Sequence, residues 1–269
     1  MQQKYYRMTI AGCERDLPLC PLNDNMMIAA FVIFGDPELT TACADALLKK
    51  APEYDYLITA EAKGIPLVHE MARLAGNQRY MLARKSPKLY MTGVTEVNVR
   101  SITTDHPQKL YLDTADANMM KGKKILIVDD VVSLGDSLHA LEELVKAAGG
   151  EICGRMTILA EGNAKNRDDL IYLDELPLFD KNGNVILSIS RNDGNLMNHS
   201  EYEYDEYGNK TLETGYDENG NIGYQFKFEY KYDKYGNMTL AIYYDRDGNV
   251  ETKTEYTNPR FTYRPQEEE

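Results

Sequence analysis

The stretch "KKILIVDDVVSLGDSLHALEEL", residues 123–144, decides the fold of the larger part of this chain. An apolar segment at 124–128 leads into two adjacent aspartates, a short Ser-Gly loop and then a helical pattern. Apolar residues three and four positions apart predict the helix, and Gly149 and Gly150 predict its end. A strand that runs through a short loop into a helix is the building unit of an α/β fold.

The same alternation extends toward the N-terminus. Apolar runs predict strands, and their near-continuous hydrophobicity is typical of a sheet covered on both faces. The expected strands are 27–35, 54–60, 78–83 and 124–130, and the expected helices are 37–51, 66–76 and 136–150. This pattern predicts an α/β domain with a mostly parallel sheet and flanking helices.

The chain changes character near residue 180 and becomes repetitive. The units FDKNGN, YDEYGN, YDENGN, YDKYGN and YDRDGN recur between runs rich in tyrosine. A Gly-Asn pair between alternating segments is a hairpin signal, so we expect a small all-β hairpin-repeat region, as a meander or solenoid. The unit resembles the YD-type repeats of bacterial surface and toxin proteins. Packing of the tyrosines in a thin sheet and calcium binding are alternative interpretations.

These changes predict three segments. Residues 1–182 form the α/β domain, residues 183–260 form the tyrosine-rich repeat region, and residues 261–269 form an acidic, disordered tail.

Charge and composition exclude several classes of function. The formal net charge is −13, which disfavours general affinity for nucleic acid or for an anionic membrane. We expect neither a membrane span nor a signal peptide, and hence a cytoplasmic protein. The four cysteines are scattered and the chain has four histidines, so free thiols are expected and a zinc site is not.

The loop after the two aspartates predicts a ligand site. A helix N-terminus offers free N–H groups to a phosphate, and Asp129 and Asp130 offer acceptors to hydroxyls or to a magnesium-bound sugar. Phosphate beside a diol describes a ribose 5-phosphate. Asp136 is expected to cap a helix that begins near Ser137. Alternatively, Asp136 faces the phosphate and weakens its binding.

The motif VDDVVSLGDS, residues 128–137, resembles the signature of type I phosphoribosyltransferases. Leu134 and Asp136 depart from the family pattern, in which a threonine and a small residue are common. The segments 55–76, 82–90 and 161–170 resemble further loops of adenine phosphoribosyltransferases in the same order. The resemblance covers roughly residues 10–180 and implies the type I phosphoribosyltransferase fold.

The resemblance also implies the reaction. The enzyme would transfer ribose 5-phosphate from phosphoribosyl pyrophosphate to a nucleobase, and the resemblance favours a purine such as adenine. Asp129 and Asp130 would be catalytic, holding the ribose hydroxyls as positive charge develops. Mg²⁺ would be held through the donor and not directly by the protein. The implied substrate-binding residues are Ser133, Leu134, Gly135, Asp136 and Ser137 for the 5-phosphate, and Glu61, Ala62, Lys63, Gly64, Arg84, Lys85 and Lys88 for pyrophosphate.

Proton transfer at the base is the least defined part of this hypothesis. The family has a glutamate in its mobile loop, and the nearest residue in this chain is Asp105, with His106 as a second candidate. The alternative function is a non-catalytic or regulatory protein of the same fold that binds a nucleotide, or a protein partner through the repeats. A homodimer is a further expectation, since the family commonly dimerises.

Overall fold

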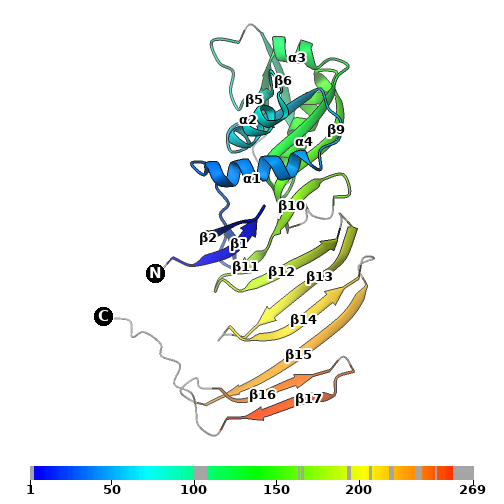
Figure 1. Cartoon of the computed structure of the whole chain (residues 1–269). Coiled ribbons are helices and arrows are strands. Elements are labelled where there is room, and N and C mark those ends of the chain that lie inside the picture. Colours follow the sequence, from blue (N-terminus) through cyan, green and yellow to red (C-terminus); the bar gives the residue numbers. More distant parts are fainter. Residues whose placement is uncertain are drawn as a thin grey trace, which may run out of the picture. The chain divides into compact units, whose positions relative to one another are not determined.

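The chain consists of two units, Met1–Leu178 and Phe179–Glu269 (Figure 1). The structure is a computed structural model. It describes residues 3–91, 93–99, 108–162, 164, 167–192, 195–205, 208–217, 221–233, 238–245 and 247–256.

A five-stranded parallel sheet forms the centre of the first unit, with strand order β10-β9-β8-β4-β5 (Figure 1). This arrangement confirms the predicted parallel sheet. Its strands are β4 (Tyr56–Ala60), β5 (Met81–Ala83), β8 (Lys124–Val132), β9 (Glu151–Glu161) and β10 (Ile171–Leu176).

Helices cover both faces of this sheet. Ile58, Ile125 and Ile127 pack in one apolar cluster with the buried face of α4 (Asp136–Ala147). The residues between them in sequence point to the opposite face because side chains alternate along a strand. There α1 (Pro37–Leu48) and α2 (Gly64–Ala75) pack on each other and on the sheet. This double cover explains why the strands read as continuous apolar runs.

Shorter elements complete the first unit. They are β1 (Tyr5–Ile10), β2 (Cys13–Pro21) and β3 (Met26–Ala29), which pair antiparallel, the ribbon of β6 (Val94–Val99) and β7 (Gln108–Asp113), and α3 (Thr114–Met120).

The predicted strand at 27–35 is wrong beyond Ala29. Phe31 and Ile33 are buried in a connecting segment, so their apolar character reflects burial and not strand structure. Asp36 then ends this segment by accepting the Leu39 N–H at the start of α1, at 3.0 Å.

The second unit is an antiparallel arrangement in which each strand from β12 to β17 pairs with the next in sequence (Figure 1). The strands are β11 (Leu178–Asp180), β12 (Val185–Asn192), β13 (Asn195–Tyr204), β14 (Lys210–Tyr216), β15 (Ile222–Tyr232), β16 (Met238–Tyr244) and β17 (Val250–Glu255).

The recurring Asp and Asn residues close the turns of this unit. The Asp carboxylate accepts the backbone N–H of the Asn four residues later at 2.8 Å in four turns, those beginning at Asp180, Asp205, Asp217 and Asp245. The backbone N–H of each Asp returns a bond to the carbonyl of the same Asn. The recurring spacing of Asp and Asn therefore has a structural reason, since each of these carboxylates bonds within its own turn, and Asp205 also accepts a hydrogen bond from Tyr232.

No helix in the described part of the chain is long and apolar enough to cross a membrane.

We predict that residues 1–182 fold without the second unit. The parallel sheet and the helices on its two faces all lie within this fragment, so it contains its own core. Thermal unfolding followed by circular dichroism should show one cooperative transition. An insoluble fragment, or one that unfolds without a transition, would contradict the proposed boundary at residue 182.

Candidate active site

The carboxyl ends of β4, β8 and β9 meet at one edge of the parallel sheet, and charged side chains lie in or directly after the last residues of each strand. Nζ of Lys63, in the loop after β4, lies 2.8 Å from Oδ2 of Asp130 on β8. Glu161, the last residue of β9, is 8% exposed, and the positive charge of Lys63 acts to lower its pKa. Because parallel strands end together, residues from three separate sequence segments form one charged cluster.

The strand β8 does not end on the aspartates, contrary to the sequence prediction. It continues through Val132, because Val131 and Val132 pair with Leu159 and Ala160 of β9. This extension places Asp130 within the sheet, where it is only 2% exposed. A charge in that position needs a partner, and Lys63 supplies it.

The two aspartates have different environments. Oδ1 of Asp129 accepts the backbone N–H of Asp130 at 2.9 Å. Burial raises the pKa of Asp129, and the neighbouring Asp130 carboxylate raises it further. The pair therefore combines one carboxylate that contacts Lys63 with one carboxyl group that resists ionisation.

The loop after β4 joins the site to the basic segment at 84–88. Glu61 donates its N–H to the Ala83 carbonyl at 2.9 Å, and its carboxylate accepts the Lys85 N–H at 3.0 Å. Its other oxygen lies 3.6 Å from Nη2 of Arg84. The peptide bond between Glu61 and Ala62 is cis. Glu61 thus binds to the basic segment, while Lys63 points to the carboxylates.

The predicted cations are not equally close to this loop. Arg84 pairs with Glu61, its backbone bonds to Tyr111, and its guanidinium lies 6.0 Å from the Tyr90 ring centroid. Nζ of Lys88 bonds to Ser86 Oγ at 2.9 Å, within its own segment.

Gly64 brings the start of α2 close to the carboxylates. A Cβ placed on it would lie 2.1 Å from Oγ1 of Thr59 and 3.2 Å from Oδ1 of Asp129. Any larger residue would push the start of α2 away from the sheet. This close approach explains why a glycine occupies the first position of the helix.

The prediction that Asp136 caps the helix after the 133–137 loop is wrong. The helix α4 begins at Asp136, and Gly135 holds the N-cap position with a left-handed φ of 86°. Asp136 therefore lies inside the first turn, and no side chain caps this helix. The left-handed turn requires glycine, which leaves Asp136 one position too late to be the cap. Its charge still lies at the favourable end of the helix dipole.

The other residues of this loop take distinct positions. The Ser133 hydroxyl bonds to the Glu161 carboxylate, Leu134 is 69% exposed, and Ser137 is exposed on α4. Burial raises the pKa of Glu161, while Ser133 and Lys63 oppose that rise. Ser133 therefore links the loop to the charged cluster.

Sequence reasoning missed Glu161. The segment 161–170 was matched only to a loop of the family, and its first residue was given no role. The signal was a carboxylate directly after the apolar run of β9, the same pattern that identified Asp129 and Asp130. Asp105 and His106, the candidates for proton transfer, lie outside the described residues.

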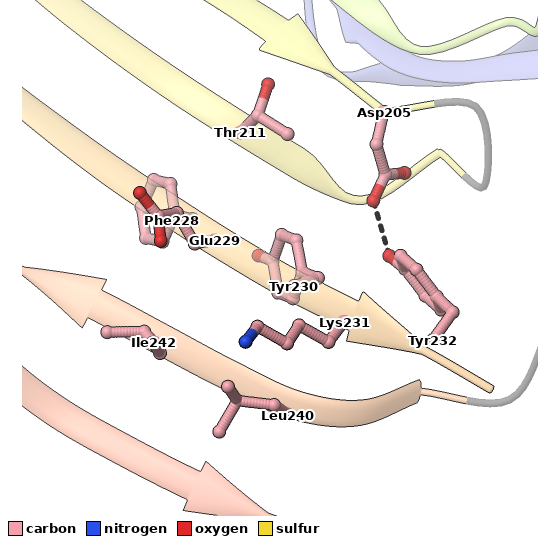
Figure 2. A pocket seen from close by; sticks show the side chains of 9 residues that line it. All are labelled: Asp205, Thr211, Phe228, Glu229, Tyr230, Lys231, Tyr232, Leu240 and Ile242. Carbon is pink, nitrogen blue, oxygen red and sulfur yellow. Dashed lines mark hydrogen bonds between the residues drawn. The ribbon is translucent and has the colours of Figure 1, made fainter.

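A hollow of 330 Å³ on the second unit is a weaker candidate for an active site than the charged cluster. Figure 2 shows that the Tyr232 hydroxyl points at Asp205, to which it donates a hydrogen bond. Asn209 donates to the same hydroxyl at 2.6 Å, and burial raises the pKa of Tyr232. The polar groups bond to one another and connect β15 to an earlier turn. The lining residues are Asp205, Thr211, Phe228, Glu229, Tyr230, Lys231, Tyr232, Leu240 and Ile242.

Fold and site together define a phosphoribosyltransferase. The family model described as phosphoribosyl transferase domain matches residues 37–186, more than half of the chain, so the chain belongs to this family. This result confirms the predicted fold of the first unit and identifies the chain as an enzyme of the phosphoribosyltransferase class.

Two curated relatives are similar over about half of the chain. A hypoxanthine/guanine phosphoribosyltransferase of Methanococcus maripaludis strain C5 is 34% identical over 132 residues, which cover 49% of this chain and 67% of that protein. The protein of the same name from Methanotorris igneus is 31% identical over 147 residues, covering 54% and 73%.

Solved structures of adenine phosphoribosyltransferases are more distant. The one from Thermoanaerobacter pseudethanolicus is 21% identical, with a TM-score of 0.47, over 53% of this chain and 84% of that chain. The one from Saccharomyces cerevisiae is 18% identical, with a TM-score of 0.45, over 64% and 92%.

We predict that Gly64→Ala destabilises the protein by about 1–3 kcal/mol through overpacking against Thr59. Ala would otherwise favour a helix over Gly by about 1 kcal/mol, so the direction of the change is diagnostic. Urea unfolding of Gly64→Ala, Thr59→Ala and the double variant measures the coupling. Thr59 Oγ1 is buried and makes no hydrogen bond with the described residues, so its removal should restore part of the loss. Additive effects would show that the contact is absent.

We also predict that Asp129→Asn stabilises the fold as pH rises. The folded pKa of Asp129 lies above its unfolded value, so its favourable contribution is complete below pH ~4 and is lost above it. Asn keeps the acceptor for the Asp130 N–H and cannot ionise. Between pH 5 and 8 the free energy of unfolding of the variant, relative to wild type, should increase by about 1.4 kcal/mol or more.

The control for this experiment is Asp16→Asn. Arg7 lowers the pKa of the exposed Asp16, so its folded and unfolded pKa values both lie below pH 5, and the stability of this variant relative to wild type should stay constant between pH 5 and 8. If Asp129→Asn showed the same flat profile, the assignment of a raised pKa to Asp129 would be wrong.

Proposed function

We propose that this enzyme transfers ribose 5-phosphate from phosphoribosyl pyrophosphate to a purine base. The observation that supports the proposal is the ion pair between Lys63 and Asp130, which lies beside Asp129. It is at the edge of the parallel sheet where the 133–137 loop leads into α4. The pair holds acceptors for the ribose hydroxyls and a cation for the pyrophosphate within one cluster.

Each group has a role that follows from its charge. Asp129 and Asp130 accept hydrogen bonds from the ribose hydroxyls and stabilise positive charge that develops on the ribose. Lys63, together with Arg84, Lys85 and Lys88, neutralises the departing pyrophosphate. The N–H groups around Gly135 bind the 5-phosphate. In this proposal Ser133 exchanges its bond to Glu161 for one to the phosphate, and Asp105 assists proton transfer at the base.

The charges of the site fit a magnesium ion that arrives bound to phosphoribosyl pyrophosphate. Mg²⁺ binds readily through substrate phosphates, so the diphosphate would hold it, while Asp129 and Asp130, the latter paired with Lys63, remain for the ribose hydroxyls. When bound, the ion supplies positive charge to the diphosphate.

The names of the curated relatives support one choice of base. The two relatives described above carry the name hypoxanthine/guanine phosphoribosyltransferase. We therefore propose hypoxanthine or guanine as the acceptor ahead of adenine, the base that the sequence motifs alone favoured.

The test is pyrophosphate release from the magnesium-bound donor with hypoxanthine, guanine and adenine. The double variant Asp129→Asn with Asp130→Asn should lower kcat/KM at least ~100-fold, which corresponds to about 2.7 kcal/mol of transition-state stabilisation. Asp45→Asn, a surface carboxylate on α1, controls for the loss of charge and should leave turnover unchanged. A double variant as active as wild type, or no release with any of the three purines, would refute the proposal.

A further inference from the structure

An ion cluster of four side chains lies behind the 133–137 loop. Nε of Arg155 lies 2.6 Å from Oε1 of Glu142 and 3.2 Å from Asp169. Nη2 of Arg167 lies 2.9 Å from the same oxygen of Glu142. Glu142 is on α4 and is 7% exposed. Two cations and two carboxylates balance, so the cluster is neutral and well bonded.

Arg167 differs from Arg155 in reaching the loop. Its Nε and Nη2 donate to Asp169 at 2.9 and 3.0 Å, and Nη2 also donates to Glu142. Its Nη1 donates to none of the described residues. A Cβ built on Gly135 would lie 3.6 Å from this Nη1 and, apart from Gly135 and its two chain neighbours, within 4 Å of no other described atom. One edge of the guanidinium is therefore held by carboxylates, and the other faces the loop.

This geometry is that of a prepared phosphate ligand. A guanidinium forms directional, charge-assisted hydrogen bonds to phosphate oxygens, and a group held in place beforehand loses little freedom on binding. Its side chain is 31% exposed, so solvent and ligand can reach it. The bonds to Asp169 and Glu142 also raise the pKa of Arg167 and keep it charged.

The position of Asp136 makes such a cation useful. The carboxylate lies in the first turn of α4, next to the N–H groups that would bind the phosphate. A like charge near a phosphate weakens binding, and a nearby guanidinium offsets it. Arg155 bonds to the same two carboxylates, but we do not expect it to offset the charge of Asp136 at the loop.

We propose that Arg167 Nη1 binds the 5-phosphate of the ribosyl donor together with the backbone N–H groups of the 133–137 loop. This inference rests on the proposed function, which places the phosphate on that loop. It assigns Arg167 a direct contact with the substrate, and Glu142 and Asp169 the positioning of the guanidinium.

Calorimetry with the full chain tests the inference, with ribose 5-phosphate and pyrophosphate as separate probes. Arg167→Gln should weaken ribose 5-phosphate binding at least about tenfold, which is ~1.4 kcal/mol, and leave pyrophosphate binding within about twofold. Arg155→Gln removes an equivalent cation from Glu142 and Asp169, so it is the matched control. It should change both affinities by less than about threefold, and both variants should lower Tm similarly. Arg167→Lys, which keeps the charge, should recover part of the affinity.

The outcomes separate this inference from the proposed function. If wild type binds ribose 5-phosphate and Arg167→Gln binds it equally well, the inference fails and the proposed function stands. Equal losses in Arg167→Gln and Arg155→Gln would also overturn it, since the cluster would then only support the loop. If wild type binds neither probe, the inference and the proposed function fail together.

Discussion

The ion pair between Lys63 and Asp130 is the interaction on which the site depends. It connects the loop after β4 to the strand β8, at the edge where both strands end. A carboxylate as buried as Asp130 is costly to ionise without a partner, and the lysine compensates for that cost while remaining half-exposed to solvent. The pair therefore positions two oppositely charged groups toward the same space, which a reaction with a sugar cation and a diphosphate leaving group requires.

The surrounding packing keeps this pair in place. Gly64 brings the start of α2 against Thr59 and Asp129, so the lysine before it lies within reach of β8. Glu61 ties the same loop to the segment that carries Arg84 and Lys85. The raised pKa of Asp129 is a consequence of this close arrangement, because burial and a neighbouring carboxylate both oppose its ionisation. The close packing of charged groups around Asp129 lowers local stability, and such clusters of groups with shifted pKa values are common at active sites.

Much of this arrangement could be predicted from the sequence. Asp129 and Asp130 stood out because two carboxylates after an apolar strand have no place in an ordinary core, and the order of the loops resembled one family. The extension of β8 to Val132 could not be read from the motif, since it depends on pairing with β9. The cap at Gly135 depends on a left-handed φ. The Asp136-Ser137 pair that follows Gly135 in the sequence instead suggested a cap at Asp136. Glu161 was overlooked because its role comes from the neighbouring strand, and Arg167 because its bond to Glu142 and its approach to Gly135 join segments that are distant in sequence.

The most direct measurement is a crystal structure of the enzyme with ribose 5-phosphate and Mg²⁺. The proposed function predicts the phosphate on the backbone N–H groups of the 133–137 loop and the ribose hydroxyls within hydrogen-bonding distance of Asp129 and Asp130. A ribose bound elsewhere, or a phosphate seated on Lys63 with the sugar directed away from the two aspartates, would contradict it.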